Sequence, residues 1–373
     1  MKKIKTMVAL LITSALMVTA CSSPATTKPG ETTGGENDPS FVFVVTDQLG
    51  DKSFNDSAAE GTKKIADELG YETKIIEIGR DQTKWEPTIL DLSEEGKYTA
   101  IFLNGSGTQE IIERIAPDYP EQKYVLFDAT VEEGSSENIY AISYKQNEGS
   151  YLGGVVAGLV TKGDSGMPNA NADNKIGFIG GDAGPIISDF LVGYIEGAKS
   201  VNPDIKVYVS YVGSWTDTAK AKELANAQFN SGVDVIFPAA MTAGLGVIEA
   251  AEEKGKYIIG VDSDQASLLA ETDEDKANVI LTSVIKEVGE SLYLYAEKVG
   301  KGEDKYGTTD VLGVKEETTG IVINDYYTKN VPQAIRDQVM EAEKAIVDGD
   351  IDVSTALGVN EQVVNEIVDS VKP

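Results

Sequence analysis

The chain has 373 residues and carries 61 acidic against 32 basic side chains, a net charge of −29 at neutral pH. This acidic balance argues against binding to nucleic acid, whose partners present basic surface, and we expect it to keep the protein monomeric. There is no histidine and only one cysteine, so the commonest general base, the commonest metal ligand and an intrachain disulfide are all missing.

The N-terminus has the pattern of a secretory signal. Three of the first five residues are lysines, and an uncharged apolar run follows over residues 7–18, which is too short to span a bilayer as a helix. Cys21 follows small residues, at the place where a bacterial lipoprotein is cleaved and acylated. We expect residues 1–20 to be a lipoprotein signal peptide, with Cys21 carrying the lipid that anchors the protein to the extracytoplasmic face of the cell membrane.

Residues 21–39 have the composition of a disordered tether. Beyond Cys21 the segment reads SSPATTKPGETTGGENDP, which is polar and has no apolar side chain larger than that of alanine. Such a segment cannot bury enough surface to offset the entropy of ordering it. It therefore predicts a flexible connection between the membrane and a folded domain.

Short apolar strands alternate with helical segments from residue 41 onward. The first series predicts strands at 41–47, 72–78, 99–105, 123–129 and 139–144, with helices at 54–69, 86–95 and 109–116. Strands that are apolar on both faces and separated by helices are typical of a parallel sheet covered on both sides.

A second series of the same kind follows. It predicts strands at 175–181, 207–213, 233–239, 257–262, 279–283 and 319–323, with helices at 148–160, 187–201, 218–230, 246–254, 287–299 and 332–347 and a short one at the C-terminus. Two series are too many strands for one sheet, so the fold class is α/β with two Rossmann-like lobes joined by a multi-strand hinge. We assign residues 40–143 and 284–308 to the first lobe, and 144–283 and 309–373 to the second.

Polar or glycine-rich clusters follow the predicted strands. They are Asp47, Asn104-Gly105-Ser106, Asp128, Gly180-Gly181-Asp182 and Asp262. Ligands of open α/β sheets bind at the carboxyl ends of the strands. The three single aspartates are the more telling, because carboxylates beside buried strands are costly unless something pairs with them.

The motifs of common catalytic and metal sites are absent. No phosphate loop, G-x-G-x-x-G, G-x-S-x-G or H-E-x-x-H occurs in the chain. The S-x-x-K match at 283–286 lacks a partner K-T-G and lies on a predicted strand. Residues 169–173 are similar to the start of a calcium loop, but Asn174 and Gly180 stand where that loop needs Gly and Glu. We expect no metal, no cofactor and no enzymatic activity.

Six strings in order carry a family resemblance. They are TDQLGDKSFNDSAAEG, FDA, SYKQNEGSYLGGVVAGLV, GLGVIEAA, GVDSDQ and TSVIKEVGESLY. From residue 41 to about 286 the chain resembles the basic membrane protein family, also called PnrA-like or Med-like. The resemblance implies a type I periplasmic-binding fold, a lipoprotein that serves an ABC permease and ATPase, and a small-molecule ligand such as a purine nucleoside.

The resemblance also implies roles for residues in these strings. Phe54 and Asn55 match the aromatic and amide that hold the base, with Asp47 in the same loop; Asp128 matches the aspartate that binds the base; Phe190 matches a second covering aromatic. Asp262 and Lys286 match the pair that grips the ribose hydroxyls, and Gly244 lets the backbone approach the ligand. Asp189 departs from the family, which usually has a basic residue there.

The residues themselves fit a nucleoside. Aromatic faces can cover a base, an ionised aspartate accepts from two hydroxyls in short, charge-assisted bonds, and Lys286 can donate to the diol and offset the charge of Asp262. Three alternatives stay open: the same fold binding a sugar or an autoinducer, a nucleoside hydrolase, and a surface receptor that signals. DQLGDKSFND lacks the paired aspartates that a hydrolase of this kind needs for its metal.

Overall fold

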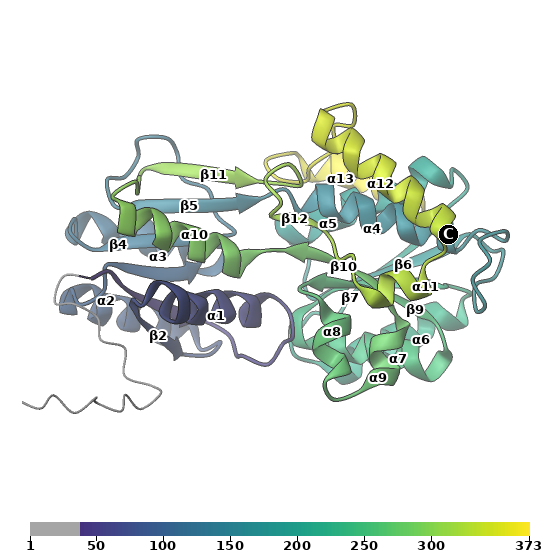
Figure 1. Ribbon diagram of the computed structural model, residues 1–373, viewed down its shortest axis with the longest axis horizontal. Helices are drawn as coiled ribbons and strands as arrows, with labels where there is room; N and C mark the ends of the chain where they lie inside the picture. The colour runs from purple at the N-terminus through teal and green to yellow at the C-terminus, as the bar shows by residue number, and fades with distance from the viewer. Residues whose placement is uncertain (1–37) are drawn as a thin grey trace, which may run out of the picture.

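The structure is a computed structural model that describes residues 38–373. It consists of two α/β lobes side by side, each built on a six-stranded sheet (Figure 1). The predicted signal peptide, Cys21 and most of the predicted tether lie outside the described residues. No helix within residues 38–373 has the length and apolar character needed to cross a membrane.

The first lobe has an entirely parallel sheet with the strand order β11-β5-β4-β3-β1-β2. Its strands are β1 (Ser40–Val45), β2 (Glu72–Glu77), β3 (Ala100–Asn104), β4 (Lys123–Phe127), β5 (Ile139–Tyr144) and β11 (Thr308–Leu312). Helices α1 (Phe54–Lys64), which continues as η1 (Ile65–Leu69), and α10 (Val288–Lys301) pack on one face. Helices α2 (Trp85–Glu95) and α3 (Gly105–Ile115) pack on the other, with the short turns η2 (Gln82–Lys84) and η3 (Ala116–Asp118) beside them.

The second lobe repeats this plan with the strand order β12-β10-β9-β8-β6-β7, in which only β12 runs antiparallel. Its strands are β6 (Lys175–Gly180), β7 (Lys206–Tyr211), β8 (Val235–Ala239), β9 (Tyr257–Asp262), β10 (Ile280–Lys286) and β12 (Thr319–Ile321). One face carries α4 (Gln146–Val160), α5 (Pro185–Val201) and α12 (Gln333–Asp348). The other carries α6 (Thr218–Asn230), α7 (Gly244–Lys254) with η4 (Met241–Ala243), and α8 (Gln265–Ala270).

The sequence analysis located the main strands and helices but missed four elements. These are β11, α8, α9 (Glu274–Val279) and α11 (Asp325–Asn330); the predicted C-terminal helix is α13 (Glu361–Asp369). The three helices are each one or two turns long, so they show no amphipathic period. Strand β11 has the sequence TTDVL at a sheet edge, where its residues stay partly exposed and need little apolar character.

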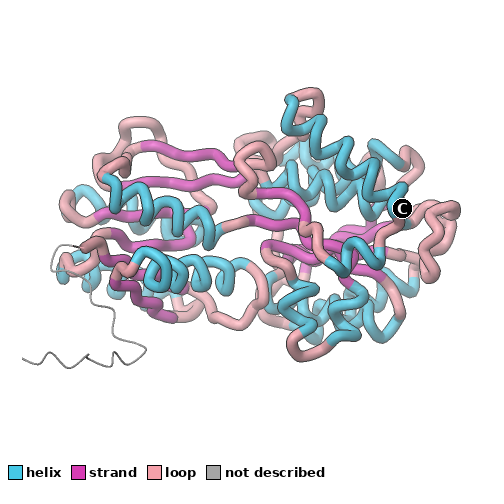
Figure 2. The backbone as a smooth tube through the Cα atoms, in the orientation of Figure 1, coloured by secondary structure: helices cyan, strands magenta, loops and turns pink. Residues whose placement is uncertain are grey.

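The chain crosses between the lobes three times, after β5, after β10 and after β11 (Figure 2). The last two crossings come later than expected. Residues 284–286, which we placed in the first lobe, belong to the second sheet, where 284 and 285 pair with β9 and 286 pairs with β12. Residues 309–312, which we placed in the second lobe, pair with β5 in the first sheet. The boundaries at 284 and 309 are therefore corrected, because strand pairing and not sequence punctuation sets them.

Helices α4 and α5 approach each other unusually closely, and this contact positions one wall of the cleft. A Cβ atom on Gly193 would lie 2.1 Å from the Asn147 carbonyl oxygen, and one on Gly197 would lie 1.9 Å from that of Tyr151. Only glycine permits this distance. The packing fixes α5, and with it the side chain of Phe190 near the start of the helix.

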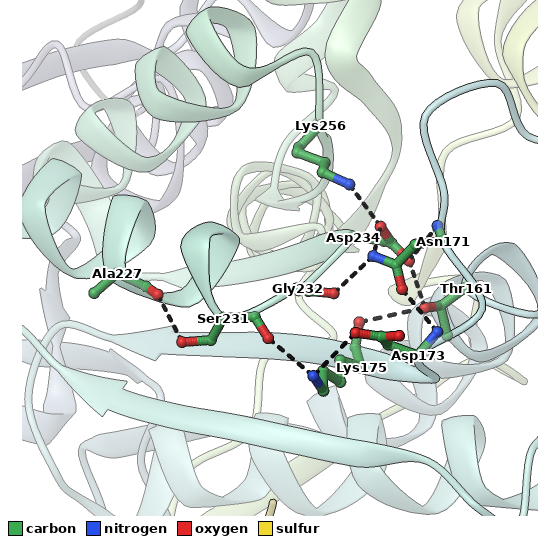
Figure 3. A network of polar contacts seen from close by, with 9 residues as sticks. All are labelled: Thr161, Asn171, Asp173, Lys175, Ala227, Ser231, Gly232, Asp234 and Lys256. Atoms are coloured by element: carbon green, nitrogen blue, oxygen red, sulfur yellow. Dashed lines mark hydrogen bonds and ion pairs between the residues drawn. The ribbon is translucent and has the colours of Figure 1, made fainter.

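A polar network closes the amino end of the second sheet, away from the carboxyl ends of its strands (Figure 3). Its centre is Asp234, which is fully buried. The Asp234 carboxylate accepts from Thr161 Oγ1 at 2.8 Å, from the backbone and side-chain nitrogens of Asn171 at 3.1 and 2.8 Å, and from Lys256 Nζ at 2.7 Å. Asn171 thus secures the loop whose sequence is similar to a calcium loop.

Candidate functional site

A cavity of about 450 Å³ lies between the lobes, a size typical of small-molecule sites. The carboxyl ends of β1, β3 and β4 reach it from one lobe, and those of β8, β9 and β10 reach it from the other. Seven of the eight predicted ligand residues line it, namely Asp47, Phe54, Asn55, Asp128, Phe190, Asp262 and Lys286. The strand-end residues Asn104, Ser106 and Asp182 line it too. The structure therefore brings together side chains that are up to 239 positions apart in the sequence, Asp47 and Lys286 being the extremes.

The backbone turns sharply where two of the strands end. Asp128 follows β4 with a φ of 55°, and Asp262 ends β9 with a φ of 63°. A non-glycine residue rarely adopts this left-handed conformation. Of the six non-glycine residues within 38–373 that do, Lys52, Asp128, Met241 and Asp262 all lie in or beside the cleft. Backbone strain of this kind concentrates at functional sites.

Lys286 and Asp128 form a buried ion pair that joins the lobes. Lys286 Nζ donates to the two carboxylate oxygens of Asp128 at 2.8 and 2.7 Å, and the side chains are 2% and 6% exposed. An ammonium group has three N–H donors, so one is left to point elsewhere. We expected Lys286 to accompany Asp262, but its direct partner is Asp128, because β10 directs the side chain toward the end of β4.

Asp262 accepts a hydrogen bond from the Ser53 hydroxyl of the opposite lobe. Burial raises the pKa of Asp262 to about 6, against the opposing effects of the positive charge of Lys286 and the hydrogen bond from Ser53. The negative charges of Asp51 and Asp128 raise it further. The expected electrostatic effect of Lys286 on Asp262 is thus present without direct contact.

The loop before α1 is held rigid by the buried carboxylate of Asp51. Its oxygens accept from the backbone nitrogens of Ser53, Asn55 and Asp56 at 3.0, 3.0 and 3.2 Å, and from the Asn55 side chain at 2.9 Å. Burial raises the pKa of Asp51, which these backbone hydrogen bonds oppose. The loop presents Phe54 and Asn55 to the cavity in one fixed orientation.

Two phenylalanine rings from opposite lobes flank the lysine ammonium group. Lys286 Nζ lies 4.9 Å from the ring centre of Phe54 and 5.3 Å from that of Phe190, within the range of cation–π attraction. Each ring is supported from behind, Phe54 by Phe127 at 5.5 Å and Phe190 by Phe237 at 5.9 Å between ring centres. The arrangement offers flat apolar surface and charged groups in the same cavity.

Asp47 lines the cavity in a different state from the other two strand-end aspartates. Both of its oxygens accept from Arg80, the one from Arg80 Nε at 2.6 Å. Asp47 is therefore paired within its own lobe, unlike Asp128 and Asp262, and the Arg80 side chain is 37% exposed.

Two sequence features do not reach the cavity. Gly244 is not among the lining residues, and a Cβ there would meet only Pro238 at ordinary contact distance, 3.6 Å. Our expectation for Gly244 is therefore corrected: η4 intervenes, and Met241 lines the wall instead. The carboxylate of Asp189 points away and accepts from Gln146, Thr355 and the Ala356 backbone.

Sequence reasoning missed both tryptophans. Trp85 and Trp215, the two in the chain, line the cavity from opposite lobes. A Cβ on Gly181 would lie 2.3 Å from the Trp215 ring, so this indole rests directly on the glycine after β6. Isolated aromatics in the polar segments QTKWEP and GSWTD were the available signal. Within residues 38–373 no group of histidine, cysteine or acidic side chains could hold a metal ion.

Comparison with known proteins defines the class. The family model of the ABC transporter substrate-binding protein PnrA-like matches residues 39–355. The chain belongs to this family, whose members are substrate-binding proteins of ABC transporters.

Individual relatives agree over most of their length. The ABC transporter nucleoside-binding protein BmpA of Lactococcus lactis is 33% identical over 83% of this chain and 88% of its own. The CD4+ T-cell-stimulating antigen of Listeria monocytogenes is 32% identical over 92% of this chain and 96% of its own. A crystal structure of an ABC transporter solute-binding protein from Aeropyrum pernix K1 superposes with a TM-score of 0.76 at 25% identity, covering 90% of this chain and 97% of that one. The predicted family and fold class are confirmed.

Proposed function

We propose that this protein captures a nucleoside, of the purine class, in the interlobe cleft and delivers it to a membrane permease driven by an ATPase. The observation that carries the proposal is that two aromatic rings, two buried aspartates and one lysine from both lobes line a single cavity. A nucleoside is a small molecule with a flat base, which aromatic rings can cover, and a vicinal diol, which charged side chains can bind. The nucleoside-binding relative from Lactococcus lactis supports the same class.

Each group has a distinct part in this proposal. The base lies against Phe54 and Phe190, with Asn55 at its edge. The Asp262 carboxylate accepts from the ribose hydroxyls, and the remaining N–H of Lys286 donates to one of them. Asp128 holds the Lys286 ammonium group in place, and its remaining lone pairs accept from the base. Closure of the lobes buries the ligand because it has higher affinity for the closed form.

The charge of the cleft favours nucleosides over nucleotides. Its wall carries four aspartates but only two cationic side chains, Arg80 and Lys286, and both cations are already paired with aspartates. A phosphate would meet uncompensated negative charge in a largely buried site. We expect a neutral ligand.

Isothermal titration calorimetry with adenosine, guanosine and inosine tests the proposal. Ribose, free bases and adenosine monophosphate serve as matched competitors, and quenching of the two cleft tryptophans gives a second signal. Nucleoside heats that exceed those of ribose and of the monophosphate are expected. If only ribose or another sugar gave binding heat, the proposed ligand would be a carbohydrate and not a nucleoside.

The enzymatic alternative has its own test. Inosine incubated with the protein at high concentration is expected to remain intact by chromatography, since the family consists of substrate-binding proteins. Release of hypoxanthine in proportion to protein would contradict a purely binding role.

We further propose that Cys21 is acylated and anchors the protein at the extracytoplasmic face of the membrane. The proposal rests on the signal-like residues 1–20 and on the family, whose transporter partners lie in the membrane. Labelled palmitate is expected in the wild-type protein and not in Cys21→Ala. Equal labelling of both would end the lipoprotein assignment.

A further inference from the structure

A second set of contacts joins the lobes beside the ligand cavity. Gln265 Nε2 donates to the Lys52 carbonyl oxygen at 3.1 Å, and Ser263 Oγ donates to the Ser53 carbonyl oxygen at 3.3 Å. With the Ser53–Asp262 hydrogen bond these make three contacts between residues 52–53 of one lobe and 262–265 of the other. We call this set the clasp. No chain crossing lies within it.

The part of the clasp in the first lobe is held in place by hydrogen bonds within that lobe. Lys52 has a φ of 53°, and its backbone nitrogen donates to Asp56 Oδ2 at 2.9 Å. The left-handed backbone turns the Lys52 carbonyl toward the second lobe. Because Asp51 and Asp56 hold the loop from both sides, the carbonyls of Lys52 and Ser53 cannot move independently of Phe54 and Asn55.

The part of the clasp in the second lobe is also held by a hydrogen bond within its own lobe. Gln265 is 2% exposed, and its side-chain oxygen accepts from the Val261 backbone nitrogen at 3.0 Å. That bond fixes the amide so that its NH₂ group faces the other lobe. Gln265 therefore connects the end of β9, which carries Asp262, to the loop that carries Phe54.

Gln265 is buried across the lobe interface but does not line the ligand cavity, and neither does Ser263. A residue that only stabilised the second lobe would have no need of a partner in the first. We propose that Gln265, assisted by Ser263, is a positioning residue that stabilises the closed arrangement and so slows release of the ligand. Only the identity of that ligand rests on the function proposed above.

The variant Gln265→Met keeps the side-chain volume and removes both the donor to Lys52 and the acceptor of the Val261 nitrogen. Its matched control is Gln228→Met, because Gln228 is also buried but donates only within the second lobe, to the Phe178 and Tyr208 carbonyls and to Ser210 Oγ. Ser263→Ala is the second clasp variant and removes a single hydroxyl, so it tests the proposal even if Gln265→Met folds poorly.

The first readout is the distance between the lobes and needs no ligand identity. Spin labels on cysteines at Glu95 and Glu223, exposed positions of α2 and α6, are placed in a Cys21→Ser background. Wild type and Gln228→Met are expected to share a population at the short distance of this structure, with or without nucleoside. Both clasp variants are expected to shift it toward longer distances.

The second readout is the rate of ligand release, from stopped-flow tryptophan fluorescence with adenosine or inosine. Loss of one or two hydrogen bonds predicts dissociation faster by roughly three- to tenfold, with little change in the association rate. Clasp variants that match Gln228→Met in both distance and release rate would overturn the proposal, as would a wild type that never reaches the short distance. If no nucleoside binds while the variants still shift the distance, the proposed ligand fails and the clasp stands.

Discussion

Two ion pairs between a buried aspartate and a lysine have the same chemistry and different surroundings. Lys256 Nζ lies 2.7 Å from Asp234 at the amino end of the second sheet, and Lys286 Nζ lies 2.7 Å from Asp128 at the carboxyl ends of the strands. Asp234 accepts further bonds from Thr161 and Asn171, all within one lobe (Figure 3). Among the described residues, Asp128 has Lys286 alone as hydrogen-bond partner, and that lysine belongs to the other lobe.

The difference teaches how to separate a structural carboxylate from a binding one. Both cost desolvation energy. Around Asp234 that cost is offset entirely by partners in the same lobe, so nothing remains to bind a solute. Asp128 and Asp262 border a cavity with lone pairs to spare, and their few partners come from across the cleft. Hydrogen-bond partners from the opposite lobe, more than burial or charge, mark the site.

The largest expected effect comes from breaking the saturated network. Asp234→Ala removes the carboxylate that accepts from Thr161, Asn171 and Lys256 and leaves Lys256 without its anionic partner. Removing one partner of a buried pair costs about 3 kcal/mol or more. We expect the free energy of unfolding, measured by urea denaturation, to fall by that amount. Nucleoside affinity of the folded fraction should stay unchanged, because the network lies away from the cleft.

A surface pair provides the control for this stability loss. Glu223 and Lys220 are both exposed, and Glu223→Ala should change the unfolding free energy by less than about 1 kcal/mol. If Asp234→Ala were as mild as this control, the claim that the network is a structural anchor would be wrong.

The next effect is on binding. Asp262→Ala is expected to weaken nucleosides by about 2–5 kcal/mol, the cost of removing one member of a buried charged network, while free bases lose much less. Calorimetry with adenosine and adenine gives the two losses side by side. Equal losses for nucleoside and base would refute the ribose contact, and Asp234→Asn is the control for a buried aspartate outside the cleft.

The pKa of Asp262 adds a pH dependence with two opposite signs. Since its folded pKa of about 6 lies above the unfolded value of 3.8, the folded state binds the proton more readily between these pH values. This group's contribution to stability therefore grows as pH falls from 6 toward 3.8 and is lost as pH rises through 6. Burial raises this pKa most; the charge of Lys286 and the Ser53 hydrogen bond lower it, and the charges of Asp51 and Asp128 raise it.

Affinity should move the other way. If the ribose hydroxyls bind the ionised carboxylate only, nucleosides bind about tenfold more weakly at pH 5 than at pH 7. Titration calorimetry across this range measures the slope for wild type and for Asp262→Asn, whose profile should be flatter. A wild-type profile as flat as that of the variant would show that the charge of Asp262 takes no part in binding.

The sequence was sufficient to predict much of this because the strands are buried on both faces and end in polar residues. Apolar runs such as FVFVV and KYVLF located the sheets, and the aspartates after them lie in the cleft. The sequence could not predict which of the cleft residues form hydrogen bonds with one another. That Lys286 contacts Asp128 rather than Asp262 depends on how two lobes with separate sheets face each other, and no local pattern records that. Strand β11 and the tryptophans were missed because edge strands and isolated aromatics carry no periodic signal.

The smallest effect is expected at Asp47, the third strand-end aspartate. It lines the cavity, but Arg80 donates to both of its oxygens, and that arginine is 37% exposed. Asp47→Ala should therefore lower the unfolding free energy by only about 0–1 kcal/mol. Because Asp47 is paired with an arginine of its own lobe, its removal should also weaken adenosine far less than removal of Asp262 does in the same calorimetric series. Arg80→Ala tests whether Asp47 takes no part in binding or is kept from the ligand by Arg80. If Arg80→Ala strengthens binding in the wild-type background but not in the Asp47→Ala background, the arginine keeps Asp47 from the ligand. A loss at Asp47 as large as at Asp262 would mean that a carboxylate paired within its own lobe still binds solute, and would contradict pairing across the cleft as the mark of the site.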